Sequence, residues 1–209
     1  MRIFKRSRKD HWERVYQKHS SNEVGWYQIY PESSLKLIKN TRVSTDCRII
    51  DVGGGTSKLS RCLLDQGYTQ LTVLDISENS LEKAKSQLGV ESNRITWIEA
   101  DVTKHRFNAQ YDVWHDRAVF HFLTKTEERK AYIDSLDQTL ALNGHLIIAT
   151  FSLDAPQKCS GLSIVRYSPD SLQKELGNNF NLVESFLENH VTPSGVAQNF
   201  IYCQFIKQA

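Results

Sequence analysis

The sequence of 209 residues lacks any apolar run long enough to cross a membrane, which takes about 18 or more apolar residues in succession. It also has few cysteines, and these form no C-x-x-C pair and have no histidine cluster at metal-ligand spacing beside them. The four are Cys47, Cys62, Cys159 and Cys203. We therefore expect no membrane association, no metal site, and free thiols in a cytoplasmic protein.

The chain also lacks a marked excess of one charge, with 26 Lys and Arg against 24 Asp and Glu and a formal net charge of +2. Its basic residues are scattered except within the first nine positions, which hold Arg2, Lys5, Arg6, Arg8 and Lys9. We interpret this basic run as a solvated chain end. Because no basic patch is evident elsewhere, nucleic acid is not expected as a partner.

Short apolar strands alternate with helices through the middle of the chain. Strands are predicted at 48–52, 71–75, 95–100, 111–114 and 145–151. Helices are predicted at about 10–19, 31–40, 59–66 and 126–140, with another that begins after Ser77. Two extended runs at 182–190 and 197–206, joined by 192–195, predict a terminal hairpin. This order indicates an α/β fold with a doubly wound, mostly parallel sheet, closed by an antiparallel hairpin and covered by helices on both faces.

Three consecutive glycines, Gly53 to Gly55, follow the first strand and precede a helix. Glycine lets the backbone pass close to a ligand because no Cβ stands in the way. A dinucleotide fingerprint beginning at Gly53 would require glycine at position 58, which is Lys58 here. Asp51 would repel a pyrophosphate but would suit a cationic group such as the amino group of a methionine moiety. The turn therefore indicates a nucleoside ligand without phosphates.

Two more acids follow the next two strands. Asp75 lies 20 residues after Gly55, the spacing at which an acid accepts hydrogen bonds from ribose hydroxyls, although it could instead cap the next helix. Asp101, followed by Val102, comes after the third strand, where a carboxylate can bond the exocyclic amine of adenine and a backbone N–H can bond a ring nitrogen. Since the carboxyl ends of parallel strands share one edge, we expect the three acids to line one crevice.

In this order the motifs resemble those of the class I (Rossmann-like) S-adenosylmethionine-dependent methyltransferases over nearly the whole chain. The segments that carry the resemblance are 51–55, Asp75, 99–102, 111–113, 142–146 and the terminal hairpin. The family has an antiparallel seventh strand, so the resemblance implies a seven-stranded sheet. It also implies S-adenosylmethionine as the cofactor and S-adenosylhomocysteine as the product. Where the family pattern has a third glycine, this chain has Ser57.

The resemblance implies a role for each cofactor-binding position. Asp51 and Gly53 to Gly55 would hold the methionine end, Asp75 the ribose, and Asp101 with Val102 the adenine. The full set of expected cofactor contacts is Trp26, Asp51, Gly53, Gly54, Gly55, Asp75, Ile76, Asp101, Val102 and Asp116.

The segment 24–28 resembles a motif of the subgroup that includes the lysine methyltransferases of elongation factor and citrate synthase, with Gly25 in place of serine. Segments 116–122 and 158–162 resemble instead an uncharacterised bacterial branch. Trp26 is expected in a lid over the cofactor, or else in the core against the first helix. We predict a single methyltransferase domain over 1–209, with a helical lid segment at 1–40 and a Rossmann-like core at 41–209.

Methyl transfer from a sulfonium needs alignment more than a catalytic triad, so few residues are candidates for chemistry. The loop after the fourth strand is the family's acceptor-facing position, and its candidates here are Asp116, Arg117 and His121. His121 could deprotonate an acceptor or be a satisfied histidine at a helix start. Arg117 could clamp a substrate carboxylate or pair with a surface acid. We interpret Cys159 as part of a Gly-containing loop over the site rather than as a nucleophile.

The sequence leaves the methyl acceptor open between a protein side chain, lysine above all, and a small metabolite. The fourth strand lacks the Asn-Pro-Pro-aromatic motif of amino-group methylation on a nucleic-acid base. Two other functions stand as alternatives: an NAD-dependent oxidoreductase, and a catalytically silent module that only binds a nucleoside.

Overall fold

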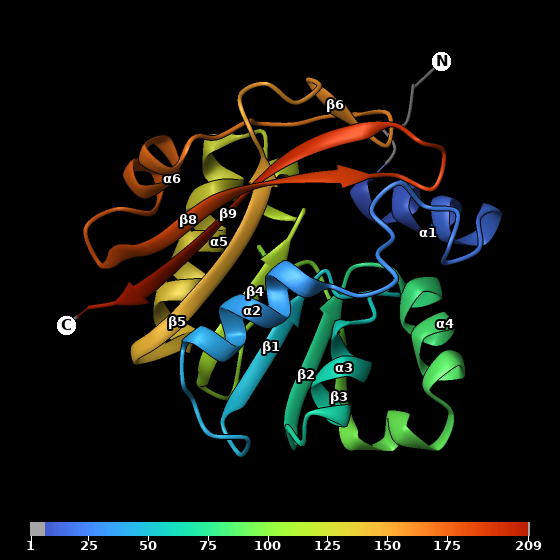
Figure 1. Cartoon of the computed structure of the whole chain (residues 1–209), viewed down its shortest axis with the longest axis horizontal. Helices are drawn as coiled ribbons and strands as arrows, with labels where there is room; N and C mark the ends of the chain where they lie inside the picture. Colours follow the sequence, from blue (N-terminus) through green and yellow to red (C-terminus); the bar gives the residue numbers. More distant parts are fainter. Residues whose placement is uncertain (1–6, 209) are drawn as a thin grey trace.

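The structure is a computed structural model that describes residues 7–208. Its centre is a seven-stranded sheet in the order β3-β2-β1-β4-β5-β9-β8 (Figure 1). The strands are β1 (Arg48–Val52), β2 (Gln70–Asp75), β3 (Ile95–Glu99), β4 (Tyr111–Arg117), β5 (Leu140–Phe151), β8 (Phe180–Val191) and β9 (Ala197–Lys207). The first five are parallel, and β9 runs antiparallel between β5 and β8. The predicted sheet and its terminal hairpin are confirmed.

Helices pack on both faces of this sheet, as its alternating pattern requires. They are α1 (Arg8–Lys18), α2 (Glu32–Asn40), α3 (Leu59–Asp65), α4 (Glu78–Leu88), α5 (Thr126–Thr139) and α6 (Pro169–Leu176), with 3-10 turns η1 (Gly89–Arg94) and η2 (Phe120–Phe122). Successive strand residues point to opposite faces, so Ile49 packs with the side chains of α2 and α3, and Ile50 with those of α5 and α6. In Figure 1, α2 lies in front of the sheet and α5 behind it.

Three features of the fold differ from the sequence prediction. Strand β4 continues to Arg117, and β5 begins at Leu140 because Leu140 already pairs with Tyr111, before a register shift. Helix α6 was not predicted, although Ser168 caps it and Pro169 opens it. A two-stranded hairpin, β6 (Lys158–Cys159) with β7 (Leu162–Ser163), turns through two residues with positive φ, as short hairpins do.

Of the two residues of the predicted solvated basic chain end that can be described, Lys9 is exposed as predicted, whereas Arg8 is partly buried. Arg8 and Lys9 lie in the first turn of α1, where Arg8 Nη2 donates to Glu128 Oε2 at 2.7 Å and Lys9 pairs with Glu99. Arg2, Lys5 and Arg6 lie outside the described residues. Within 7–208, no helix has the length and apolar character that a bilayer span requires.

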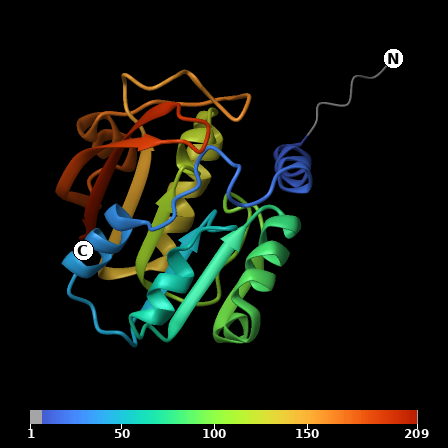
Figure 2. The same ribbon diagram turned by 45° about the vertical axis from the view of Figure 1, so that its right-hand side comes forward.

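Helix α1 sits at the carboxyl edge of the sheet and is joined to α4 by caps in both directions. Glu13 of α1 accepts hydrogen bonds from Glu78 N at 2.8 Å and Asn79 N at 3.2 Å at the start of α4. Lys83 of α4 donates to carbonyl oxygens at the end of α1, including His19 O at 2.7 Å. Figure 2 shows α1 above the upper end of α4, at the edge toward which β1 and β2 point. These caps hold α1 over the ends of the parallel strands.

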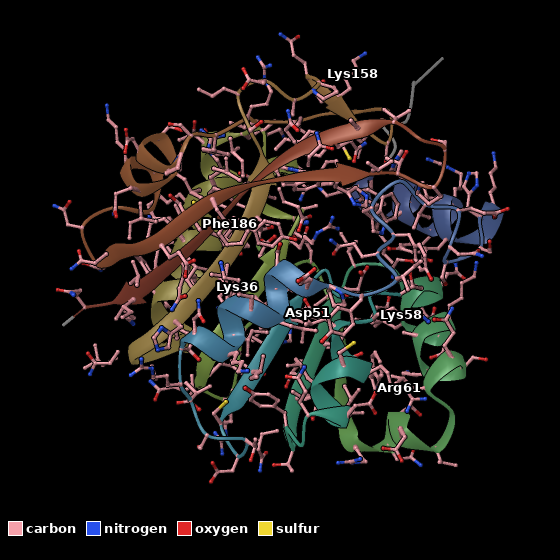
Figure 3. All side chains as sticks on the ribbon, viewed as in Figure 1. Lys36, Asp51, Lys58, Arg61, Lys158 and Phe186 are labelled. Carbon is pink, nitrogen blue, oxygen red and sulfur yellow. The ribbon has the colours of Figure 1, made fainter. Side chains whose placement is uncertain are left out.

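Helix α2 and the terminal hairpin also meet. Lys36 of α2 lies over the ring of Phe186 of β8, with Nζ 4.7 Å from the ring centroid (Figure 3). The same lysine pairs with Glu184 of β8 at 3.2 Å. This contact ties the segment before β1 to the far edge of the sheet.

Candidate active site

A cavity opens over the carboxyl ends of the parallel strands, which is the usual ligand position in an open α/β sheet; it is the larger of two that adjoin and is called the large cavity below. Asp75 and Ile76 after β2 line it, as do Asp101 and Val102 after β3. Two of the three acids that follow successive strands in the sequence, Asp75 and Asp101, therefore line one cavity.

A second, smaller cavity adjoins the first. The two share Trp26, Gly53 and Arg117 in their walls. Asp51 lines only the second, together with Lys58 at the start of α3 (Figure 3). The glycine turn thus separates the two cavities. Asp51 lines the second cavity, and Asp75 and Asp101 line the first.

The glycine turn leaves no room for side chains. A Cβ on Gly53, which has φ of +69°, would lie 2.0 Å from Val119 Cγ2. A Cβ on Gly54 would lie 2.5 Å from Asp51 Oδ2, and one on Gly55 would lie 2.7 Å from Asp75 Oδ2. The absence of side chains therefore leaves both carboxylates open at the turn.

Asp51 is held by one oxygen and leaves the other unpaired. His115 Nδ1 donates to Asp51 Oδ1 at 2.7 Å, and His115 Nε2 lies 2.8 Å from Ser34 Oγ of α2. Asp51 Oδ2 is buried and has no hydrogen-bond partner among the described residues. Burial of an unpaired carboxylate oxygen is costly, so this atom is poised to accept from a ligand.

Asp75 is buried at the end of β2, where its Oδ1 accepts from Ser77 N at 2.8 Å. Burial raises its pKa to about 7 against the hydrogen bonds from Ser77 and Ser80, and the nearby charges of Asp51 and Glu13 raise it further. The alternative reading as a helix cap is partly correct, but the side chain of Ser77 is the cap of α4 and accepts from Ser80 N. Asp75 still lines the large cavity.

Asp101 is oriented by its own loop. Its Oδ1 accepts from Thr103 N at 3.0 Å and from Thr103 Oγ1 at 2.7 Å. Lys104 Nζ lies 3.7 Å from Oδ2. The loop therefore fixes the carboxylate through one oxygen.

Arg117 ends β4 at the boundary between the two cavities. Its Nε donates to Tyr202 Oη at 2.8 Å and its Nη1 to the backbone oxygen of Trp26 at 2.9 Å. Trp26 in turn packs edge-on against Trp12 and Tyr16 of α1. The segment 24–28, α1 and the end of β4 thus form one wall.

Comparison with known proteins agrees with this geometry. Residues 49–144 match the family model described as a methyltransferase domain. The chain is 28% identical over 139 residues to the eEF1A lysine and N-terminal methyltransferase of Bos taurus, covering 66% of this chain and 20% of that protein. It is 33% identical over 105 residues to the malonyl-[acyl-carrier protein] O-methyltransferase of Anoxybacillus flavithermus, covering 49% and 38%. The match thus spans about a fifth of the eEF1A methyltransferases.

A solved structure shares the whole fold. The N-methyltransferase NodS from Bradyrhizobium japonicum, in complex with S-adenosylhomocysteine, aligns with a TM-score of 0.70 at 17% identity, over 96% of this chain and 100% of that one. Residues 49–144 are thus a methyltransferase domain by sequence, and the chain shares the fold of the class I S-adenosylmethionine-dependent methyltransferases. Its sequence is related to that of the eEF1A enzymes, and the oxidoreductase alternative is not favoured.

Two predicted site residues lie away from both cavities that residues 7–208 form. Asp116 is fully buried, with Oδ1 accepting from Val119 N at 2.8 Å and Oδ2 from Tyr132 Oη at 2.6 Å. The prediction that it faces the cofactor or the acceptor is wrong because side chains alternate along β4. His115 and Arg117 reach the cavities, and Asp116 between them points to the other face.

His121 is also misplaced as a base. It is fully buried in η2, where Nδ1 accepts from Phe151 N at 3.3 Å. Burial lowers its pKa to about 3, so it stays neutral at physiological pH. The alternative of a satisfied histidine at a helix start is supported for Nδ1 only, because Nε2 is buried without a hydrogen-bond partner among the described residues.

Several residues that line the cavities had no functional signal in the sequence. Trp12 and Tyr16 of α1, and Gln198 and Phe200 of β9, line the large cavity. Trp12 and Tyr16 stand four residues apart on an apolar helix face, which predicts that they are buried but not what they pack against. Cys159 also lines this cavity, and burial raises its pKa to about 11, so its thiol is protonated and unsuited to nucleophilic attack.

Proposed function

We propose that this methyltransferase binds S-adenosylmethionine across both cavities and transfers its methyl group to an acceptor that approaches beside Arg117. The observation that carries this proposal is the unpaired, buried Oδ2 of Asp51 at the edge of the glycine turn. An α-amino group is a cationic donor of the kind that this oxygen requires. Lys58, which lines the same cavity, suits the α-carboxylate.

The adenosyl part of the cofactor would occupy the large cavity. Asp75 would accept from the ribose hydroxyls, and Asp101 from the exocyclic amine of adenine. Ile76 and Val102 supply apolar surface for the rings beside these acids. Gly55 supports the ribose assignment, because a side chain there would meet the Asp75 carboxylate.

When bound, the cofactor supplies a methyl group on a sulfonium, which bonds to the lone pair of an acceptor atom while the electron pair of the sulfur–carbon bond stays on sulfur. The protein's part is to align the acceptor and remove water. Trp12, Tyr16 and Trp26 serve this end by closing the cavity from the side of α1. We accordingly propose residues 1–40 as a lid on a core of residues 41–209 in a single domain.

The names of the relatives leave the acceptor open. They include methylation of a lysine and an N-terminus of eEF1A and O-methylation of malonyl-[acyl-carrier protein]. The proposed function therefore includes both protein and small-molecule acceptors. We also propose a cytoplasmic location, with which the four free cysteines of the described chain agree.

Calorimetric titration of the purified protein with S-adenosylmethionine, S-adenosylhomocysteine and NAD tests the cofactor site. We expect micromolar binding of both adenosyl ligands, none of NAD, and a marked loss of affinity in Asp51→Asn, which keeps the shape of the side chain but lacks its charge. Tight binding of NAD alone would overturn the proposal. Transfer of labelled methyl groups to a cell extract then separates an enzyme from a silent binding module, because only an enzyme turns over.

A further inference from the structure

The large cavity extends beyond the positions proposed for the cofactor. Past the glycine turn its wall is formed by Arg117 at the end of β4, Gln198 and Phe200 of β9, and Cys159 of the β6–β7 hairpin. In the sheet, β4 and β9 lie on the opposite side of β1 from β2 and β3. This acceptor wall, composed of these four residues, is therefore separated by the turn from the two acids of the adenosyl side.

Arg117 on this wall is a cation with incomplete partners. Its side chain is only 10% exposed, and the two hydrogen bonds that it makes go to neutral groups, Tyr202 Oη and Trp26 O. Its Nη2 is buried and finds no hydrogen-bond partner in the described part of the chain. The carboxylate of Glu188 lies 3.8 Å from Nη2, and its Oε1 accepts instead from Gln28 at 3.2 Å. The positive charge is thus only partly compensated.

The rest of the acceptor wall is neutral. The guanidinium of Arg117 lies over the ring of Phe200, with Cζ 4.7 Å from the centroid, and the thiol of Cys159 is buried. Of the described residues, none that forms this wall is acidic. A lysine ammonium would meet the positive guanidinium, which Glu188, 3.8 Å from Nη2, compensates only in part, and this is unfavourable. A carboxylate would instead complete the hydrogen bonds of the guanidinium and accept in the planar geometry that arginine offers.

We propose that Arg117 binds the anionic group of a small acceptor, a carboxylate on an apolar or aromatic framework, against Phe200 and Cys159. The inference rests on the proposed function, because the acceptor must reach the methyl group at the boundary of the two cavities. Arg117 lines both cavities at that boundary, so an anion bound there is fixed next to the reacting centre. The acceptor class is therefore a small organic acid rather than a protein lysine.

Three probes that share a benzene ring test which charge the acceptor wall prefers in a ligand. They are benzoate, which is anionic, benzylamine, which is cationic, and benzyl alcohol, which is neutral. Each is titrated calorimetrically into the protein saturated with S-adenosylhomocysteine. We expect benzoate to bind at least about tenfold more tightly than either other probe. Equal or tighter binding of benzylamine, or absence of benzoate binding, overturns the inference. If S-adenosylhomocysteine itself does not bind, the proposed function fails instead, so the two failures are distinct.

Variants then assign the effect to Arg117. Arg117→Gln should lose the preference for benzoate while S-adenosylhomocysteine still binds. Arg166→Gln serves as the control, because Arg166 Nη1 donates to Leu153 O and Ala155 O outside both cavities. If Arg117→Gln does not fold, Arg117→Lys should retain the preference for benzoate with weaker binding. Unchanged benzoate affinity in Arg117→Gln overturns the assignment, as does transfer of labelled methyl groups from the cofactor to lysine side chains of protein in a cell extract.

Discussion

Asp75 should make cofactor binding depend on pH around neutrality. Burial, with the charges of Asp51 and Glu13, raises its pKa to about 7 in the free protein. Ribose hydroxyls donate to the ionised carboxylate, so binding should favour that form and lower the pKa of the group. If only the ionised form binds, affinity falls by up to about 30-fold, or about 2 kcal/mol, between about pH 8 and about pH 5.5. Calorimetry with S-adenosylhomocysteine across this range measures how the affinity changes with pH. Release of protons on binding near pH 6 would show that the change comes from ionisation of a group such as Asp75.

The matched control for this prediction is Asp75→Asn, which keeps the acceptor for Ser77 N but does not titrate. Its affinity should be lower at high pH and should not vary through the same window. The stability of the free protein should depend on pH in the opposite direction to the cofactor affinity. Since the folded pKa exceeds the unfolded value, the stabilisation from Asp75 is complete near pH 4 and is lost as pH rises to about 7. Asp75→Asn should therefore unfold at an equal or higher temperature than the wild type at about pH 8. An affinity independent of pH in the wild type, or the same slope in both proteins, would refute the ribose assignment.

Three further perturbations test the surroundings of the site. Gly54→Ala places a Cβ 2.5 Å from Asp51 Oδ2, so calorimetry should show at least about a tenfold loss of cofactor affinity, with near-native circular dichroism. Tyr132→Phe removes a hydrogen bond to buried Asp116 and should cost about 2–4 kcal/mol in urea unfolding. Because burial raises the pKa of Asp116 to about 6, this cost should be greater at about pH 8, where the carboxylate is charged, than at about pH 5. Glu13→Gln weakens the cap that holds α1 on α4, and should speed proteolysis within α1 in the free protein but less so with S-adenosylhomocysteine bound.

The elements around the site followed from local patterns. The strand that ends at Asp75 is a short apolar run, and Ser77 is a standard helix cap, so both were predicted within a residue or two. The same reasoning also contained an error, which followed from ending the fourth strand at 114 when β4 runs to Arg117. Alternation along β4 assigns Asp116 and Arg117 to opposite faces, so both could not face one cavity. The start of α6 was likewise visible in Ser168 followed by Pro169.

Other parts of the site depend on contacts between distant segments and could not be predicted from local patterns. The hydrogen bond between Asp51 and His115 joins neighbouring strands that are 64 residues apart in the chain. The position of Tyr16 over the glycine turn depends on the caps between α1 and α4. No pattern in 197–207 indicates that Phe200 forms a cavity wall, because a buried strand residue gives the same signal wherever it packs.

The order of charges along the carboxyl edge follows from the order of the strands. From β3 through β2 to β1 the cavity walls present Asp101, Asp75 and Asp51, and from β4 onward they present Arg117 and then neutral side chains. Such a change of sign across one crevice orients a ligand pair: donors such as the amines and hydroxyls of the cofactor on one side, and an anion on the other. The glycine turn lies between the acidic residues and Arg117. The cationic sulfur of a bound cofactor would lie there, next to both the acidic side and the Arg117 side of the crevice. An acceptor held by Arg117 would therefore approach the sulfonium from the side opposite the acids, and the preference for a small acid would follow from the strand order as much as from any one residue.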